Sequence, residues 1–548
     1  MLKNSEVAGK FRLLAKLLEL HGENPFRIRS YTNAYLNIKK WPVPVLSLSQ
    51  EELATAKGIG KTIQAKILEL AATGQIQKLE EYLEKTPVGV VEMLGIKGFG
   101  PKKISIIWKE MGIETVGELL YAINENRLVE LKGFGQKTQA DLKKQLAYHQ
   151  ESADKLLYPI AHAQASELLT QLDTLHPQHR HGLTGALRQG RPTIDTMEIL
   201  TTLPQKDIDL YCQAHPLIEV NGDEQILNKL KLKLHSTTTE DYVHRLAETS
   251  SDIQFWEALK IQSGEYEDEA TLFEQNKLPH YIPEYREHEN LPHKDDYPGA
   301  HNLITQSDLK GCIHNHSTWS DGLQSISEMM SAAMDRGYEY FVITDHSKSA
   351  IYANGLSIDR LLAQLDEIME LDRSESDFRL FSGIESDILA DGRLDYPDEL
   401  LSQLDVVVAS IHSSLKMDQI KATERLIRAI ENPYTSILGH PTGRLLLSRP
   451  AYPIDHAKVI DACADNNVAI ELNANPNRLD MDWRWIHRAM AKDVLISINP
   501  DAHSIGGLDD TAYGVMSARK GGLTPSYCLN AMDIDEFEEW LEGQHEKR

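Results

Sequence analysis

The chain has 548 residues with 57 Lys and Arg against 82 Asp and Glu, so its formal net charge is −25, and 41% of its residues are hydrophobic. This is an ordinary globular composition for a chain that should divide into about three or four domains. It excludes a membrane-spanning protein, because no run approaches about 18 consecutive apolar residues. The four widely spaced cysteines and the absence of an N-terminal leader favour the reducing cytoplasm.

The charge is unevenly distributed. Residues 1–150 carry 22 Lys and Arg against 16 Asp and Glu, a balance of +6, which leaves −31 for the rest of the chain. This asymmetry suggests that the N-terminal region binds phosphates and that the acidic remainder binds cations. Solvated surface charge with no partner is the alternative.

The N-terminal region is predicted to be helical, and a Gly-x-Gly turn recurs in it three times at spacings of 40 and 35 residues. Residues 5–20 show the apolar periodicity of a helix, with Val7, Phe11, Leu14, Leu17 and Leu18 on one face. Each turn precedes a helical stretch, whose exposed N–H groups favour a phosphate. The residues of the three turns are Gly58, Gly60, Lys61, Gly98, Gly100, Lys102, Gly133, Gly135 and Lys137. Their pattern resembles the helix-hairpin-helix element that grips the nucleic-acid backbone, so these residues are expected to bind DNA.

These turns resemble helix-hairpin-helix elements, and the segment around the first resembles a known domain. Glu23-Asn24-Pro25-Phe26-Arg27-Ile28-Arg29-Ser30-Tyr31, with the first turn and residues 65–69, looks like the small N-terminal domain of family X DNA polymerases. The resemblance implies a helical lyase-like domain over residues 1–82 and a fingers-like domain over 83–150. It also implies that Lys66 could act as a Schiff-base nucleophile on an abasic sugar. The alternative for Lys66 is a lysine on a helix surface.

Residues 151–290 resemble the palm and thumb of the same family without its catalytic carboxylates. Gly185, Arg188 and Gly190 match the palm motif, and residues 278–287 resemble the closing signature of the bacterial members. Polymerase chemistry needs paired carboxylates for two divalent ions. Asp207-Ile208-Asp209 lies too late in the chain to supply them, and we interpret it as surface acid. The positions that depart from the motif are Ala186, Gln189, Thr196, Glu198 and Lys231, so the polymerase activity is predicted to be lost.

After a linker at 291–307, residues 308–548 alternate short apolar runs with helical patterns, as βα repeats do. The runs end in ligand-type residues, which would meet at the carboxyl ends of parallel strands. A single histidine in such a place is usually structural, but this many imidazoles and carboxylates would be costly to desolvate without metal. The nine candidate ligands are His314, His316, Asp321, His346, Glu385, His412, His440, Asp501 and His503.

The same nine residues match all metal positions of the polymerase and histidinol phosphatase (PHP) domain of bacterial family X polymerases. The resemblance implies a distorted (β/α)7 barrel that holds three divalent ions, with Glu385 as a bridging ligand. It assigns His314, His316 and Asp501 to the first ion, His412 and His440 to the second, and Asp321, His346 and His503 to the third. Mixed imidazole and carboxylate ligands suit Mn²⁺, Zn²⁺ or Fe²⁺.

The predicted chemistry is metal-dependent phosphoester hydrolysis, in which divalent ions activate a water and absorb charge on phosphate oxygens. Glu385 and Asp501 are therefore the candidate catalytic residues. Arg444 and Arg478 are candidate phosphate clamps, because a guanidinium matches phosphate geometry. The alternative for each arginine is a salt bridge at the rim of the barrel.

The whole chain is thus expected to be a multidomain α+β and α/β protein with N-terminal helix-hairpin-helix domains. The favoured function is a DNA-binding 3′-5′ exonuclease or 3′-end-processing enzyme of DNA repair, acting on gapped, nicked or single-stranded 3′ ends. Three alternatives stay open: an active gap-filling polymerase with an accessory exonuclease, a phosphatase on a small phosphoester such as histidinol phosphate, and a non-catalytic DNA-binding scaffold. No membrane partner is expected. The oligomeric state is left open, with a monomer as the default.

Overall fold

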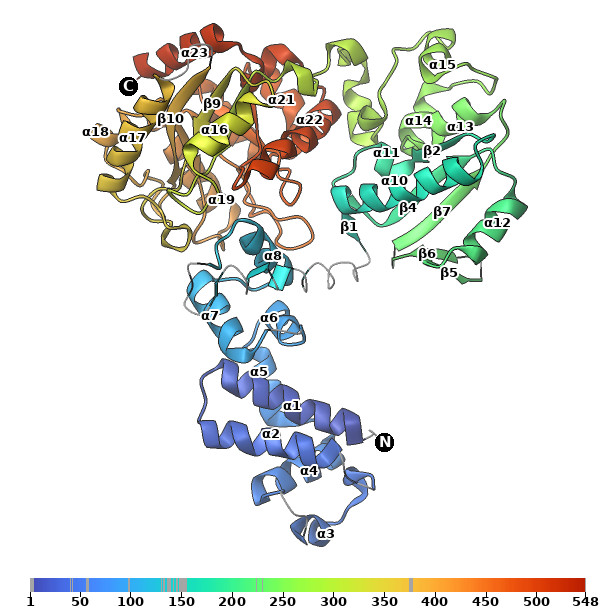
Figure 1. Ribbon diagram of the computed structural model, residues 1–548, viewed down its shortest axis with the longest axis vertical. Helices are drawn as coiled ribbons and strands as arrows, with labels where there is room; N and C mark the ends of the chain where they lie inside the picture. Colours follow the sequence, from blue (N-terminus) through green and yellow to red (C-terminus); the bar gives the residue numbers. More distant parts are fainter. Residues whose placement is uncertain are drawn as a thin grey trace. The chain divides into compact units, whose positions relative to one another are not determined.

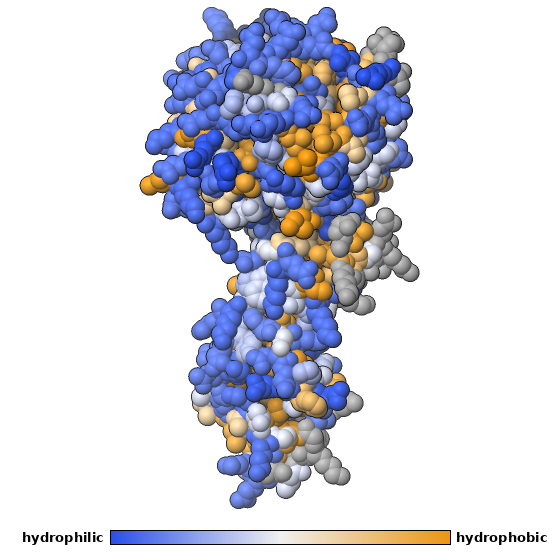
Figure 2. All heavy atoms as spheres, turned by 90° about the vertical axis from the view of Figure 1, so that its left-hand side faces the viewer, coloured by the Kyte–Doolittle hydropathy of each residue, from blue (hydrophilic) through white to orange (hydrophobic). Residues whose placement is uncertain are grey.

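The structure is a computed structural model that forms two compact units, residues 1–123 with 131–149 and residues 124–130 with 150–548 (Figure 1). It describes residues 4–547 except 40, 42, 56–58, 97–98, 130, 132–133, 136–138, 141, 144–145, 147–154, 223, 229 and 374–377. Figure 2 shows hydrophilic side chains over most of the visible surface, with smaller apolar patches between them. Among the described residues, no helix has the length and apolar character needed to cross a bilayer.

The first unit is helical, as predicted. Its first helix, α1, packs along α2 (Figure 1) and buries the apolar face expected for residues 5–20. Phe11 and Leu14 on this face are fully buried. The helices are α1 (Asn4–Leu20), α2 (Pro25–Lys39), α3 (Gln50–Thr55), α4 (Lys61–Thr73), α5 (Gln77–Glu84), α6 (Val88–Met93), α7 (Pro101–Met111) and α8 (Val116–Asn124), with the 3₁₀ helix η1 (Val45–Ser47).

The middle domain of the second unit is built on a mixed five-stranded sheet in the order β2-β4-β7-β6-β5. Among the described strand pairs of this sheet, β4–β7 is parallel and the others are antiparallel. From Leu230 to Leu234 of β7 the burial alternates, so Lys231 and Lys233 are exposed while their neighbours are buried. The strands are β2 (His181–Thr184), β4 (Thr196–Thr201), β5 (Ile218–Asn221), β6 (Glu224–Leu227) and β7 (Leu230–Ser236), and β1 (Leu156–Leu157) pairs separately with β3 (Thr193–Ile194).

Helices α10 to α15 belong to this domain, and short 3₁₀ helices connect it to the barrel. The helices are α10 (Tyr158–Leu175), α11 (Gly185–Arg188), α12 (Gln205–Ala214), α13 (Tyr242–Thr249), α14 (Ile253–Leu259) and α15 (Glu269–Gln275). Short 3₁₀ helices follow, of which the last three overlap or lie within the predicted linker at 291–307: η2 (Pro283–Tyr285), η3 (His288–Asp296), η4 (Ala300–Asn302) and η5 (Gln306–Asp308). Asn290 of η3 is buried and donates to the carbonyl of Lys520, so this helix packs against the barrel.

The C-terminal domain is a nearly closed barrel of seven parallel strands, which confirms the predicted fold class. The strands are ordered β8 to β14 without interruption, and a bridge between Asn315 and Ala502 joins the two ends. The strands are β8 (Gly311–Asn315), β9 (Tyr340–Ile343), β10 (Arg379–Asp387), β11 (Val406–Ser410), β12 (Ile437–Leu438), β13 (Ala469–Asn473) and β14 (Ile496–Asn499). The division of the chain at residues 82, 150, 290 and 307 stays a prediction.

Helices surround the strands and plug one end. Tyr340 of β9 stacks on Phe537 of α23 at 4.3 Å between ring centroids, inside a buried apolar cluster that takes residues from most strands. A second and larger apolar cluster lies between the strands and the outer helices. The helices are α16 (Ile326–Met334), α17 (Ile358–Asp372), α18 (Asp398–Leu401), α19 (Gln419–Ile430), α20 (His456–Asp465), α21 (Ile486–Met490), α22 (Thr511–Lys520) and α23 (Ile534–Glu546).

Candidate metal centre

Strand alternation places the polar residues inside the barrel. Val342 of β9 and Phe381 of β10 belong to the inner apolar cluster, so Glu385, four residues after Phe381, points to the same side. His346 follows Val342 by four residues and is also buried. The amino-terminal half of each strand therefore supplies an apolar plug, and the carboxyl-terminal half supplies ligand-type side chains.

His314 reaches the interior by a different route. Ile313 belongs to the inner cluster, so regular alternation would turn His314 outward. A register shift between Cys312 and Asn315 and a φ of 63° at His314 interrupt that alternation. Irregularities of this kind re-aim side chains next to active sites. Asp501 also has a left-handed φ, 52°, and such non-glycine residues cluster at functional sites.

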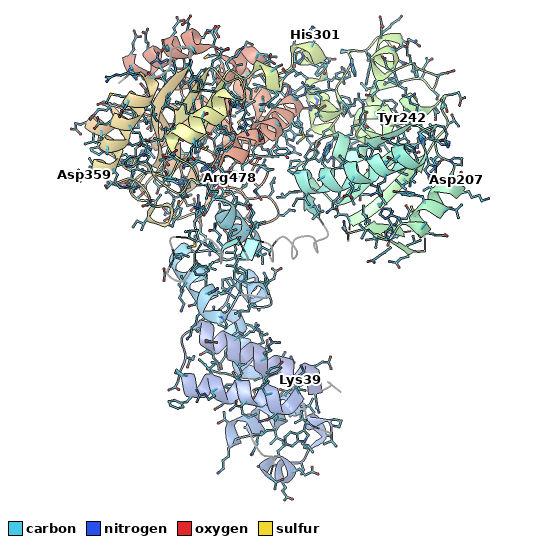
Figure 3. All side chains as sticks on the ribbon, in the orientation of Figure 1. Lys39, Asp207, Tyr242, His301, Asp359 and Arg478 are labelled. Carbon is cyan, nitrogen blue, oxygen red and sulfur yellow. The ribbon has the colours of Figure 1, made fainter. Side chains whose placement is uncertain are left out.

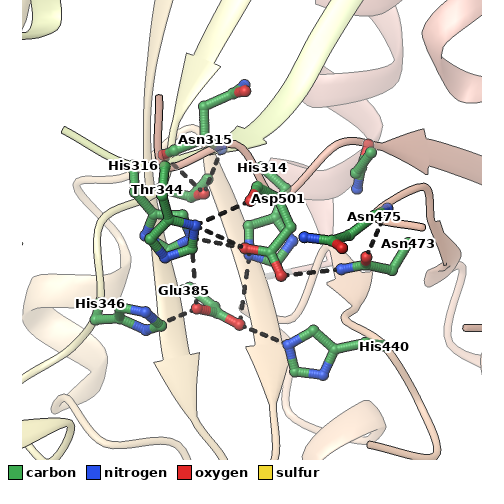
Figure 4. A network of polar contacts seen from close by, with 12 residues as sticks. His314, Asn315, His316, Thr344, His346, Glu385, His440, Asn473, Asn475 and Asp501 are labelled. Atoms are coloured by element: carbon green, nitrogen blue, oxygen red, sulfur yellow. Dashed lines mark hydrogen bonds and ion pairs between the residues drawn. The ribbon is translucent and has the colours of Figure 1, made fainter. Parts of the chain in front are cut away.

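Glu385 is approached by imidazoles from several strands, and Figure 4 shows it between His346 and His440. Its Oε1 lies 2.9 Å from His440 Nε2, 3.0 Å from His412 Nε2 and 3.4 Å from His314 Nε2. Its Oε2 lies 2.7 Å from His346 Nδ1. Glu385 is 1% exposed, so its two oxygens face imidazoles and not water.

Two further carboxylates, Asp501 and Asp321, lie near His316 and His503 and also near two of the histidines that face Glu385. Asp501 Oδ1 lies 3.1 Å from His316 Nε2 and 3.6 Å from His314 Nε2. Asp321 Oδ1 lies 3.4 Å from His503 Nε2 and 3.6 Å from His346 Nε2. The ligand atoms of three groups each lie within 4.8 Å of one another: His314, His316 and Asp501; His346, Glu385 and His412; and His316, Asp321, His346 and His503.

Many of these buried atoms make no hydrogen bond within the described part of the chain. The atoms without a partner include His314 Nε2, His316 Nδ1, Asp321 Oδ2, both ring nitrogens of His346, Glu385 Oε2, His412 Nε2, His440 Nδ1 and His503 Nε2. Buried polar atoms are normally satisfied, because an unmade bond costs about 1–3 kcal/mol. Imidazole nitrogens and carboxylate oxygens that face one another in this way fit divalent cations.

The electrostatics reflect the mixture of charges in one buried site. Burial lowers the pKa of His316 to about 3, assisted by the neighbouring His503 and His346. Burial opposes the charged form of His412, but Glu385 and Asp387 outweigh it and raise the His412 pKa to about 9. For Glu385 burial would raise the pKa, but the imidazoles of His412, His346 and His314 hold it well below the usual range.

Two buried carboxylates of the site were not predicted from the sequence. Glu471 lies 2.5 Å from His314 Nδ1, and Asp387 lies 2.5 Å from His412 Nδ1. Alternation would have indicated both, since Glu471 follows the inward Ala469 by two residues and Asp387 follows Glu385 by two.

Residues 124–130 belong to the same unit as the barrel and bring two more charged side chains near it. The Glu125 carboxylate lies within 4.8 Å of ligand atoms of Asp501 and His503. Arg127 Nη2 lies 2.6 Å from Glu125, and Arg127 Nε lies 3.4 Å from Asp321 Oδ2. No motif in the sequence indicated these two residues.

The two candidate phosphate clamps have different surroundings. Arg444 donates to Asp482 at 2.8 Å and to the carbonyls of Arg478 and Leu479, so its guanidinium braces the loop that carries Arg478. Arg478, labelled in Figure 3, is 2% exposed, and its Nε lies 3.8 Å from Asp501 Oδ2. Only Arg478 is directed at the candidate ligands.

In the first unit, Gly60 and Gly100 cap the N-termini of α4 and α7 in extended conformations with φ of −75° and −82°. A Cβ added to either glycine would meet no atom within 4 Å, so the space at both helix N-termini is open. Lys61 and Lys102 lie in the first turns of these helices and are exposed. Gly135 is also open. Gly58, Gly98, Gly133 and Lys137 lie outside the described residues.

Lys66, the candidate lyase residue, lies on α4 with its Nζ 2.5 Å from Glu69 Oε2. The side chain of Lys66 is 23% exposed. Its role as a nucleophile stays a prediction.

The middle domain places three of the polymerase-motif positions, Thr196, Glu198 and Lys231, on the less buried face of its sheet, whereas Ala186 lies on α11 and Gln189, directly after it, is buried. Thr196 of β4 is paired with Lys231 of β7. The Glu198 carboxylate lies 3.1 Å from His235 Nε2 and occupies the space over the Gly185 turn, where an added Cβ would lie 2.0 Å from Glu198 Oε2. Asp207 lies on α12, outside the sheet face (Figure 3).

Comparison with known proteins agrees with this architecture. Residues 2–76 match a helix-hairpin-helix domain, and residues 90–147 match a SAM-like helix-hairpin-helix tandem. The chain is 29% identical over 248 residues to a probable phosphatase of Thermoanaerobacter sp. (strain X514), which covers 43% of this chain and 95% of that protein. It is 31% identical over 165 residues to a probable phosphatase of Caldanaerobacter subterraneus, which covers 29% of this chain and 60% of that protein.

A further relative matches nearly the whole chain. The DNA polymerase/3′-5′ exonuclease PolX of Bacillus subtilis (strain 168) is 32% identical over 561 residues, which cover 96% of this chain and 97% of that protein. Taken with the helix-hairpin-helix domains, the mixed-sheet middle domain and the seven-stranded barrel, this similarity shows that the chain belongs to the bacterial PolX family of DNA polymerase/3′-5′ exonucleases.

Proposed function

We propose that this protein is a metal-dependent 3′-5′ exonuclease or 3′-end-processing enzyme of DNA repair whose polymerase activity has been lost. The observation that carries the proposal is the group of nine buried imidazoles and carboxylates at one end of the barrel, with many of their ligand atoms lacking a hydrogen bond among the described residues. Single-stranded, nicked or gapped 3′ ends are the proposed substrates, and the cytoplasm stays the predicted location.

The donor set fits three divalent ions, with Mn²⁺, Zn²⁺ or Fe²⁺ as the candidates. Glu385 would bridge, because its two oxygens face imidazoles on opposite sides. The first ion would take His314, His316 and Asp501, the second His412 and His440, and the third Asp321, His346 and His503. Such ions supply an activated water and stabilise charge on the transferring phosphoryl group.

The protein's own residues position the substrate. We propose that the Arg478 guanidinium binds a non-bridging phosphate oxygen, since it is directed at Asp501 and a guanidinium matches phosphate geometry. Arg444 then acts by holding the loop from Arg478 to Asp482. The open N-termini of α4 and α7, with Lys61 and Lys102, would bind the DNA backbone.

The loss of polymerase activity is supported by the surroundings of the palm motif. Where the family needs metal-binding carboxylates, the β4–β7 pair presents Thr196 beside Lys231, and a lysine repels the ion that a carboxylate would hold. Glu198 is placed over the Gly185 turn and is paired with His235. Arg188 donates to Glu269 at 2.8 and 2.6 Å and is therefore engaged in the fold.

The test compares the wild type with His314→Ala and Glu385→Ala on single-stranded and gapped DNA in Mn²⁺. A 5′-labelled strand reports stepwise shortening, and a 3′-labelled strand reports release of the terminal nucleotide. We expect each variant to lose at least about two orders of magnitude in rate, as on removal of groups that stabilise the transition state. Asp207→Ala on α12 is the matched acidic control and should keep wild-type rates. Activity that survives in both barrel variants contradicts the proposal.

A phosphatase on a small phosphoester is the second candidate, because two relatives bear that name. It predicts hydrolysis of small phosphoesters such as histidinol phosphate that excess DNA does not inhibit. An active polymerase is the third candidate, because the PolX relative is named a DNA polymerase. Template-dependent incorporation of deoxynucleotides would establish it, and we expect none.

A further inference from the structure

We propose that Glu471 and Asp387 are positioning residues of the metal centre, each fixing one ligand imidazole so that its Nε2 is presented to the ions that share Glu385. This inference rests on the proposed metal-dependent function. Neither carboxylate is among the nine candidate ligands. Both lie on the inner face of the barrel, on β13 and β10.

Glu471 is fully buried and accepts four hydrogen bonds. Its Oε1 accepts from the His440 N–H and from Asn473 Nδ2, both at 3.0 Å. Its Oε2 accepts from Asn499 Nδ2 at 2.9 Å and lies 2.5 Å from His314 Nδ1. A carboxylate with this many donors is an acceptor held in one orientation. The proton of His314 is therefore on Nδ1.

In the neutral ring with its proton on Nδ1, the lone pair of His314 is on Nε2. This atom lies 3.4 Å from Glu385 Oε1 and 3.6 Å from Asp501 Oδ1, and it makes no hydrogen bond among the described residues. Ligand histidines usually donate their second N–H to a carboxylate, which fixes the tautomer and raises the basicity of the ligand nitrogen. Glu471 would supply this support to the first ion.

Asp387 has the corresponding place at His412. It is 4% exposed, and one of its oxygens lies 2.5 Å from His412 Nδ1. Its other oxygen accepts from Ser349 Oγ at 2.5 Å. His412 Nε2 is then directed at Glu385 Oε1, 3.0 Å away. Asp387 would support the second ion.

The third site is built differently. His503 donates from Nδ1 to the backbone carbonyl of Asp501 at 3.0 Å. His346 has both ring nitrogens directed at candidate ligands, Glu385 and Asp321. Within the described residues, therefore, each of the two sites that share Glu385 Oε1 has its own supporting carboxylate: Glu471 at His314 and Asp387 at His412. The site of Asp321, His346 and His503 should not respond to changes at Glu471 or Asp387.

The test measures metal binding by the full chain, without DNA. Glu471→Gln and Asp387→Asn remove the negative charge and keep the side-chain volume. Asp480→Asn is the matched control for metal affinity, because Asp480 is equally buried but accepts from Thr442 Oγ1 at 2.8 Å and from the N–H groups of Thr442 and Arg444, with no imidazole among these donors. Each protein is stripped with chelator and titrated with Mn²⁺ and Zn²⁺, and its bound metal is counted by mass spectrometry. The melting temperature of each stripped protein is recorded in parallel.

We expect about 10–100-fold weaker binding of part of the metal in Glu471→Gln and Asp387→Asn. One ion should stay at wild-type affinity, and Asp480→Asn should match the wild type. Excess Mn²⁺ should restore nuclease activity to both variants, which a purely structural defect would not allow. Wild-type metal affinity in a folded variant overturns the proposal. If Glu471→Gln does not fold, Asp387→Asn decides by the same criterion. A wild-type protein that binds metal but cuts no DNA refutes the proposed function and leaves this inference standing.

Discussion

Glu269 offers a quantitative test of the middle domain. It lies at the start of α15 and binds two guanidinium groups: Arg188 at 2.8 and 2.6 Å, and Arg286 at 2.9 Å. Its side chain is 10% exposed, and Arg286 is fully buried. Burial alone would raise the Glu269 pKa, but Arg286 and Arg188 outweigh it and lower the pKa to about 2 from an ordinary value of 4.5.

This shift gives the sign and the size of the expected effect. A carboxylate whose pKa is lower in the folded state stabilises that state above pH 4.5, and the contribution disappears as the pH falls through about 2. One pKa unit corresponds to about 1.36 kcal/mol, so the ionised group contributes roughly 3 kcal/mol at pH 7 and roughly 1.4 kcal/mol at pH 3. We expect Glu269→Gln to lower the local unfolding free energy by these amounts.

The assay is amide hydrogen exchange in α13 and α15, which reports the opening free energy of this domain apart from the barrel. The wild type and Glu269→Gln are compared at pH 7 and pH 3, so that contributions from other titrating groups cancel. A difference below about 0.5 kcal/mol at pH 7, the range of ordinary surface substitutions, would refute the reasoning. A difference that does not shrink on acidification would also refute it.

Two further predictions concern charged residues outside the candidate metal centre. Lys61→Ala and Lys102→Ala should each weaken binding to DNA of any sequence and reduce the slope of log affinity against log salt by about one, measured by fluorescence anisotropy. An unchanged slope in both variants would show that α4 and α7 do not bind the backbone. Lys520→Met should lower the free energy of unfolding by about 3–5 kcal/mol in thermal or urea unfolding, because Lys520 is fully buried, pairs with Glu287 and donates to the carbonyl of Gln189. A variant as stable as the wild type would contradict this role.

The barrel could be predicted well because the signal is local. Each apolar run is short, and the residue that ends it is polar, as in β11 before His412. The same logic placed Lys231 on β7, where the alternating sequence and the alternating burial agree. The three Gly-x-Gly turns indicated helix starts, and Gly60 and Gly100 do cap helices.

The remaining features depend on contacts between distant segments. The inward direction of His314 arises from a register shift and a left-handed φ that no residue preference indicates. Arg444 and Arg478 look equivalent in the sequence, but only the fold shows that Arg444 binds the 478–482 loop. The inward direction of Glu471 could have been predicted from strand alternation, but its role depends on His314, 157 residues earlier in the chain.

The most direct test of the central claim is the metal content of the purified full chain, measured by inductively coupled plasma mass spectrometry before and after dialysis against Mn²⁺. The arrangement around Glu385 predicts several tightly held transition-metal ions in the wild type and a marked loss of them in Glu385→Ala. A folded wild-type protein that contains no transition metal and takes up none would contradict the account.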